Sequence, residues 1–147
     1  MRRIEAREER GQSIVEFAVV LPVLAFVLFA ILQFGITLNN YVTLTSAARD
    51  GARKGAVSRT VADPIGTTVQ AVKASAVDLN QSGCTSTSCT TNCTTTSLCV
   101  TVTPSSISGW TPGADVTVNA TYPYSISLFG LVVKSGTLTS TVTERIE

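Results

Sequence analysis

The stretch RGQSIVEFAVVLPVLAFVLFAILQFGITL, residues 10–38, joins a charged segment to a long apolar run. A single carboxylate, Glu16, stands inside the beginning of that run. An ionisable side chain costs roughly 2.5–3.5 kcal/mol at a bilayer centre and less near its edge, so its presence here indicates a functional site. If the chain is cut after Gly11, the new amino group on Gln12 lies one helical turn before Glu16 on the same face. The stretch therefore predicts a processing site coupled to a neutralising charge pair.

The apolar run is long enough to cross a membrane. From Phe17 to Leu38 it carries no charge, and a helix over this run is roughly 33 Å long at about 1.5 Å per residue. A cleavable secretory signal has a shorter apolar core, of roughly 7–15 residues. Pro22 removes one backbone hydrogen bond and is expected to kink or loosen the helix near its start. The sequence predicts a single transmembrane helix.

Composition argues against an enzyme. The 147 residues leave room for one membrane segment and one small domain. The net charge of +1 gives no basic surplus to hold nucleic acid, and histidine, the commonest general base and metal ligand, is absent. The aspartates Asp63, Asp78 and Asp115 are scattered. We therefore expect no catalytic residue, no metal, no cofactor, no small-molecule substrate and no nucleic-acid partner.

Four cysteines lie in the Thr/Ser-rich segment 81–99, at Cys84, Cys89, Cys93 and Cys99. An even number of cysteines in a short segment beside a membrane anchor indicates two disulfides in an oxidising compartment. The spacings are not the paired two-residue gaps of a zinc site. Four cysteines permit three pairings, and the sequence does not choose among them.

Small residues continue the helical spacing beyond the apolar run. Ala47, Gly51 and Gly55 are four residues apart and form one row. Such rows let helices approach each other closely. Alternatively, the two glycines only weaken the helix before it ends, by about 1 kcal/mol each relative to alanine. The sequence leaves both interpretations open.

The second half of the chain predicts a small α+β domain. Asp63 and Pro64 are a good helix cap and first residue, and an apolar stripe at four- and three-residue spacing predicts a helix over 64–80. The period then changes to two, which predicts three strands. These strands cover 98–102, 116–122 and 138–146, with a turn at 111–113. The predicted fold class is α+β, with a long N-terminal transmembrane helix that extends outside the membrane and a small antiparallel sheet packed by one helix.

The connection predicted between the last two strands, 125–136, is unusually apolar. Its large apolar residues are Ile126, Leu128, Phe129, Leu131, Val132 and Val133. Because apolar residues usually lie inside a protein, we expect them to cap the core of the sheet. The alternative is a lip that rests on the membrane or on a neighbouring subunit. The domains are then a charged leader (1–11), the transmembrane helix with its extension (12–55) and an extracytoplasmic domain (56–147).

Residues 11–55, GQSIVEFAVVLPVLAFVLFAILQFGITLNNYVTLTSAARDGARKG, resemble the TadE-like family. These are pilin-like proteins of tight-adherence (Flp, type IVc) pilus systems. The resemblance rests on GQSIVEF, on Leu21-Pro22 within the apolar run, and on AARDGARKG (47–55) after it. The end of the chain is similar to the family pattern more loosely.

This resemblance implies a pilin-like fold and a role as a minor pilin or pseudopilin in pilus assembly. It implies that a prepilin peptidase cuts between Gly11 and Gln12 and reads Glu16 and Phe17. The implied partners are the cytoplasmic membrane, that peptidase, other pilin-like subunits and the pilus assembly platform. The protein would remain in the bacterial inner membrane as a single-pass protein until it enters a surface pilus, sits at its tip or primes its assembly.

Orientation and the competing function are less constrained by sequence. Arginine and lysine residues flank both ends of the apolar run in nearly equal number, so they do not orient it. The cysteines favour an N-terminus inside and a C-terminal domain outside. The alternative function is a signal-anchored envelope domain with a disulfide-stapled binding loop that is not part of any filament. Under that interpretation the position of Glu16 is incidental.

Overall fold

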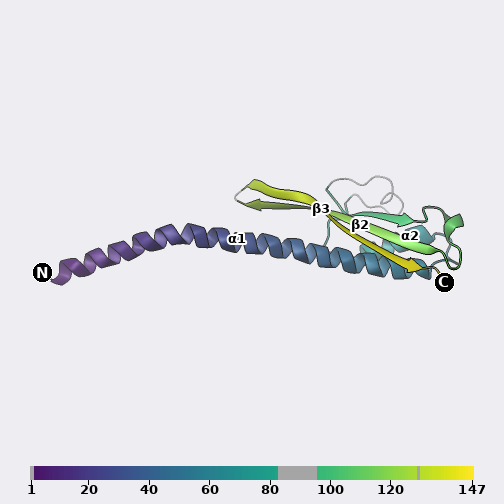
Figure 1. The fold of residues 1–147 in the computed structure, drawn as a ribbon, viewed down its shortest axis with the longest axis horizontal. Coiled ribbons are helices and arrows are strands. Elements are labelled where there is room, and N and C mark those ends of the chain that lie inside the picture. Colours follow the sequence, from purple (N-terminus) through teal and green to yellow (C-terminus); the bar gives the residue numbers. More distant parts are fainter. Residues whose placement is uncertain (1, 83–95, 129) are drawn as a thin grey trace.

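The computed structural model describes residues 2–82, 96–128 and 130–147, with side chains from residue 12 onward. A long helix leads into a compact domain (Figure 1). The elements in chain order are α1 (Arg2–Ala56), α2 (Pro64–Ser75), β1 (Cys99–Thr103), the 3-10 helix η2 (Ile107–Gly109), β2 (Asp115–Leu128) and β3 (Leu131–Arg145). The predicted architecture, a long apolar helix followed by a three-stranded antiparallel sheet packed by a helix, is confirmed.

Helix α1 is one unbroken element of 55 residues, and its two halves lie in different surroundings. Its first half extends away from the domain, and its last turns run beneath the sheet (Figure 1). From residue 12 onward, the first side chain of α1 that is fully buried is that of Leu44. Pro22 lies inside the helix, and α1 bends over its first half (Figure 1). A proline lacks the amide hydrogen that the helix ladder needs, which accounts for a bend rather than a break.

Helix α2 begins where the sequence predicts and ends earlier. The Asp63 side chain accepts a hydrogen bond of 2.8 Å from the Gly66 amide, and Pro64 is the first helical residue. The helix ends at Ser75, so the predicted extension to residue 80 is wrong. The Gln81 side-chain amide donates to the carbonyl of Lys73 at 3.0 Å and to that of Ala76 at 2.7 Å. These bonds satisfy carbonyls that a longer helix would have paired along its own backbone.

The sheet has the order β1-β2-β3, with both pairs antiparallel. Val100 pairs with Ala120 and Val102 with Val118, and these four side chains are buried. The alternate positions carry mostly threonines that face away from the core, as the period of two predicts. One face of the sheet is therefore apolar and covered by α1 and α2, and the other is polar and open.

Strands β2 and β3 are longer than the sequence predicts. Their residues pair continuously as far as Leu128 and Leu131, except for one register shift between Ile126 and Ser127. Gly130 takes a φ of 83°, a left-handed conformation that suits glycine in a two-residue hairpin turn. The predicted connection over 125–136 is thus wrong, because these residues continue both strands as a hairpin. That hairpin projects beyond the domain and runs alongside α1 (Figure 1).

The hairpin does not cap the core. Leu131, Val132 and Val133 keep 74%, 65% and 63% of their surface exposed, so the expectation that they lie inside is wrong. Ile126 and Leu128 are partly exposed, and Phe129 lies outside the described residues. The core is instead filled by α1, α2 and the inner face of the sheet. Its buried members include Leu44, Ala48, Ala52, Val69, Val72, Leu98, Val100, Trp110, Val116, Val118 and Ile146.

The row of small residues on α1 faces α2 of the same chain. Ala47, Gly51 and Gly55 are all buried. A Cβ at Gly51 would collide with the Cγ2 methyl of Val72, and one at Gly55 would come within 2.8 Å of Thr68 Oγ1. The two helices therefore approach at a distance that only glycine permits. The small residues are needed for packing inside the domain.

We expect Gly51→Ala to lower the free energy of unfolding of the C-terminal domain by about 1–3 kcal/mol. Overpacking against Val72 then outweighs the gain of up to about 1 kcal/mol that alanine has over glycine in a helix. Gly35→Ala is the matched control, because a Cβ there meets no atom within 4 Å. Thermal or denaturant unfolding of the full chain in detergent measures both. Equal stability of the two variants would contradict the close approach.

Candidate processing and assembly site

The residues around the predicted cut lie within α1. Gly11 is helical, as are Gln12 and the residues that follow. The Gln12 side-chain amide donates a hydrogen bond of 3.3 Å to Glu16 Oε1. Positions four residues apart share a helix face, and the bond shows that a donor at position 12 reaches this carboxylate. Gln12, Glu16 and Phe17 are all exposed, so the side chains that the structure describes do not cover this site.

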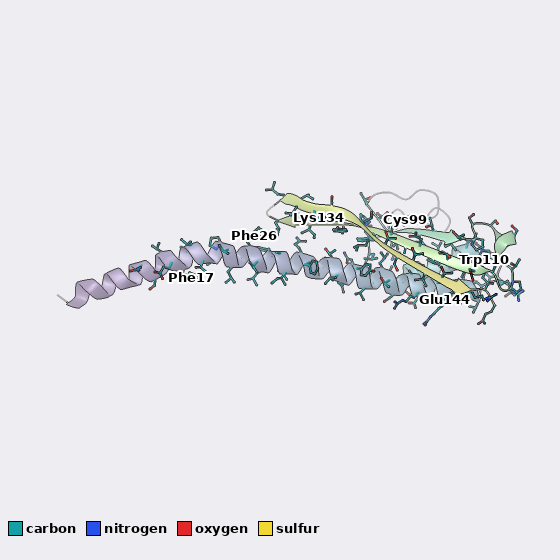
Figure 2. All side chains as sticks on the ribbon, viewed as in Figure 1. Phe17, Phe26, Cys99, Trp110, Lys134 and Glu144 are labelled. Atoms are coloured by element: carbon teal, nitrogen blue, oxygen red, sulfur yellow. The ribbon has the colours of Figure 1, made fainter. Side chains whose placement is uncertain are left out.

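The apolar part of α1 is exposed along its whole length. The candidate membrane span begins at Gln12, and its most apolar window buries none of its residues within the chain. Phe17, Phe26 and Leu38 are 63%, 49% and 48% exposed, and Figure 2 shows Phe17 and Phe26 on the part of the helix that extends away from the domain. Large apolar side chains exposed over so long a helix indicate a lipid or helical environment. This is the arrangement of a single-pass membrane anchor.

One polar side chain in the apolar run has a partner from the far end of the sequence. The Gln33 side-chain amide donates a hydrogen bond of 3.1 Å to the carbonyl oxygen of Ser127, near the tip of the β2–β3 hairpin. Thr37, one turn later, donates to the Gln33 carbonyl at 3.0 Å. Both polar groups therefore have hydrogen-bond partners within the chain. The sequence gives Gln33 no visible partner, and only the pairing of the hairpin brings Ser127 to it.

The residues at the two ends of the cysteine-rich segment are hydrogen-bonded to each other and to the sheet. The Leu98 amide donates to the Asn80 carbonyl at 2.8 Å, and the Asn80 amide donates to the Tyr122 hydroxyl at 3.3 Å. Cys99 is almost completely buried at the start of β1 and is disulfide-bonded. Cys84, Cys89 and Cys93 lie outside the described residues. The two predicted disulfides and their pairing therefore stay a prediction.

The far end of the domain meets the end of α1. The Glu147 amide donates to the Ala56 carbonyl at 3.2 Å, and Arg59 Nε donates to the Glu147 carbonyl at 3.0 Å. Ile146 is buried beside them. Among the described residues, no cluster of three or more His, Cys, Asp or Glu side chains is placed to hold a metal ion. The features that stand out are thus the start of α1, its apolar surface and the hairpin beside it.

Comparison with known proteins assigns the helix segment. Residues 11–53 match the family model described as TadE-like protein. The match covers the GQSIVEF motif, the apolar run and most of the small-residue row, so the resemblance noted from these residues is confirmed over that segment. No curated protein and no solved structure matches the chain. The TadE-like segment ends just before α1 does, so the sheet and hairpin lie outside the matched residues.

Replacing Gln33 with leucine tests whether the hairpin is tied to the helix. We expect Gln33→Leu to raise amide hydrogen exchange in residues 124–128 and 131–136 by roughly fivefold, because one hydrogen bond worth about 1 kcal/mol is lost. The control is Thr37→Val, which removes a hydroxyl whose bond is internal to the helix. Hydrogen exchange with mass spectrometry reads both variants in detergent. An unchanged hairpin in Gln33→Leu would show that the bond does not restrain it.

Proposed function

We propose that this chain is a minor pilin or pseudopilin that takes part in the assembly of a tight-adherence (Flp, type IVc) pilus. One observation carries the proposal, which is that the TadE-like segment coincides with a single apolar helix left exposed by the rest of the described chain. Such a helix needs lipid or other apolar helices around it. A pilin-like subunit meets both in turn, since the bilayer surrounds it before assembly and neighbouring helices do so afterwards.

The proposed chemistry of the site is processing followed by charge pairing. A prepilin peptidase hydrolyses the peptide bond between Gly11 and Gln12, and the backbone nitrogen of Gln12 becomes an ammonium group. The existing hydrogen bond from the Gln12 side chain to Glu16 supports this, because it puts both residues on one helix face. An unpaired charge in an apolar environment costs several kcal/mol, and a partner one turn away offsets much of that cost. Glu16 neutralises the new amino terminus, its own or a neighbour's.

The proposed setting follows from the same features. The protein is a single-pass protein of the bacterial cytoplasmic membrane, with the leader inside and the domain outside, where an oxidising compartment suits its cysteines. Its partners are the peptidase, other pilin-like subunits and the pilus assembly platform. The role is structural, with no catalytic residue and no cofactor. The 55-residue helix, continuous from the leader into the domain, supports a role in which the helix bears the load of assembly.

Blocking the cut tests the processing step. We expect Gly11→Leu to leave the leader attached, because a bulky residue replaces the small one at the proposed cleavage point. On a gel of the native host's envelope fraction, the variant migrates more slowly by a mass equivalent to residues 1–11. Gly35→Leu, with the same change inside the apolar run, is the matched control and is expected to be processed. An N-terminal sequence of the mature wild-type protein that begins elsewhere than Gln12 would refute the cut.

Removing the carboxylate tests the charge pair. We expect Glu16→Ala to impair processing or to lower pilus formation by roughly tenfold or more, since a buried ammonium loses its partner. Membrane insertion is expected to stay intact, because the apolar run is unchanged. Asp78→Ala, which removes an exposed carboxylate from the outer domain, is the control and should leave pili unaffected. Pilus counts by electron microscopy, with membrane extraction in parallel, separate assembly from insertion, and unchanged piliation in Glu16→Ala would contradict the role.

A further inference from the structure

The tip of the β2–β3 hairpin exposes apolar side chains on both faces. Leu131, Val132 and Val133 are consecutive in β3, so neighbouring side chains point to opposite faces of the strand. All three are more than 60% exposed. A soluble strand normally places apolar residues on one covered face only. A run of three consecutive exposed apolar residues therefore indicates an apolar environment around the tip.

The tip lies beside the membrane-spanning part of α1. The Gln33–Ser127 hydrogen bond of 3.1 Å fixes its level along the helix. A cleft of about 280 Å³ separates tip and helix and is lined by Phe29, Gln33, Ser127 and Leu128. Figure 1 shows the end of the hairpin running toward the N-terminal half of α1, away from the domain. The tip thus sits next to residues that the bilayer is expected to surround.

The depth of the tip follows from helix geometry. A hydrocarbon core of about 30 Å accommodates about 20 helical residues. With Glu16 at the inner boundary, the core covers residues 17–36. Gln33 then lies about 5 Å inside the outer boundary, and Phe29 about 10 Å inside. These depths match the roughly 5–10 Å that amphipathic interfacial segments reach.

Along the hairpin, the side chains change from apolar to polar, as they would across a membrane–water interface. Beyond the apolar tip comes Lys134, which is exposed and pairs with Ile126, and Figure 2 shows it on the projecting arm. A lysine at this level reaches lipid phosphates while its stem remains among acyl chains. Tyr124, opposite Gly136, lies two residue pairs further from the tip. Tyrosine is enriched where membrane meets water.

We propose that the tip of this hairpin, residues 126–128 and 130–133, inserts into the outer leaflet of the same membrane that α1 spans. The inference rests on the proposed membrane anchoring of α1 and adds a second point of lipid contact. Insertion is shallow, because a two-stranded hairpin has unpaired edge groups that hydrocarbon cannot satisfy. The Gln33 side chain satisfies one of them, the Ser127 carbonyl. The hairpin thereby sets the height and tilt of the outer domain above the bilayer.

Tryptophan quenching by brominated lipids tests the insertion. The full chain carrying Leu131→Trp is reconstituted in phosphatidylcholine vesicles whose acyl chains are brominated either near the headgroup or near the chain end. We expect the added tryptophan to lose about half of its fluorescence or more with the shallow bromines and less with the deep ones. The native Trp110 is an internal reference, because it lies beside Gly55, about 33 Å along α1 from Gln33.

Two further variants make the result decisive. Val77→Trp is the matched control, since Val77 is 73% exposed against 74% for Leu131. Val77 lies two residues after Ser75, whose hydroxyl donates a hydrogen bond to Asp50. Because Asp50 is about 25 Å along α1 from Gln33, we expect no quenching of this tryptophan.

The variant Phe26→Trp tests whether α1 itself is inserted in the bilayer. Quenching of Phe26→Trp without quenching of Leu131→Trp would overturn the hairpin proposal in favour of a protein neighbour and leave the anchor standing. Absence of quenching in both would overturn the anchor as well.

Discussion

The apolar run of α1 needs an environment that the described part of the chain does not provide. Over the membrane-length part of the helix, large apolar side chains stay about half exposed or more, whereas from Leu44 onward one face of the helix is buried. The free energy gained by removing apolar surface from water is about 25 cal/mol per Å². That gain favours lipid or other apolar helices around the apolar run, and it favours packing of the last turns against the protein core. Helix α1 therefore has two parts, and the boundary between them lies where its surroundings change.

The division explains why small residues concentrate in the last turns of α1. Leu44 is the last large apolar side chain of the helix to enter the core, and Ala47, Gly51 and Gly55 follow it. A helix with bulky residues there would hold α2 at a distance, whereas glycine lets Val72 and Thr68 contact the backbone. Helix α1 therefore supplies one wall of the core of the small C-terminal domain. The domain cannot be separated from the helix without losing that wall.

The sequence was a good guide to α1, α2 and the central strands because each has a clear period. The Asp63 cap and the alternation of Val100 and Val102 were readable from neighbouring residues alone. The hairpin was not readable, because apolar residues on both faces resemble core residues. Whether such residues are covered depends on which surface the strands meet, and that is decided by the register of β2 with β3. The contact of Gln33 with Ser127 spans 94 positions, so local pattern gave no sign of it.

The start of the helix is a different case. Gln12 and Glu16 could be placed on one face from their spacing, and the structure adds the hydrogen bond between their side chains. The row at Ala47, Gly51 and Gly55 was ambiguous between close packing and simple weakening of the helix. Its ambiguity ended with the position of α2, which comes from the short connection after Ala56. Sequence thus identified the residues that matter, and tertiary structure identified their partners.

The absence of any loop within α1 has a mechanical consequence. From the apolar run to the buried turns the backbone ladder is continuous, so a pull along the axis passes directly into the domain. Moving the helix along its axis by one turn, about 5.4 Å, moves the sheet and the hairpin by the same distance. Motion along the helix axis and motion of the domain are therefore one displacement.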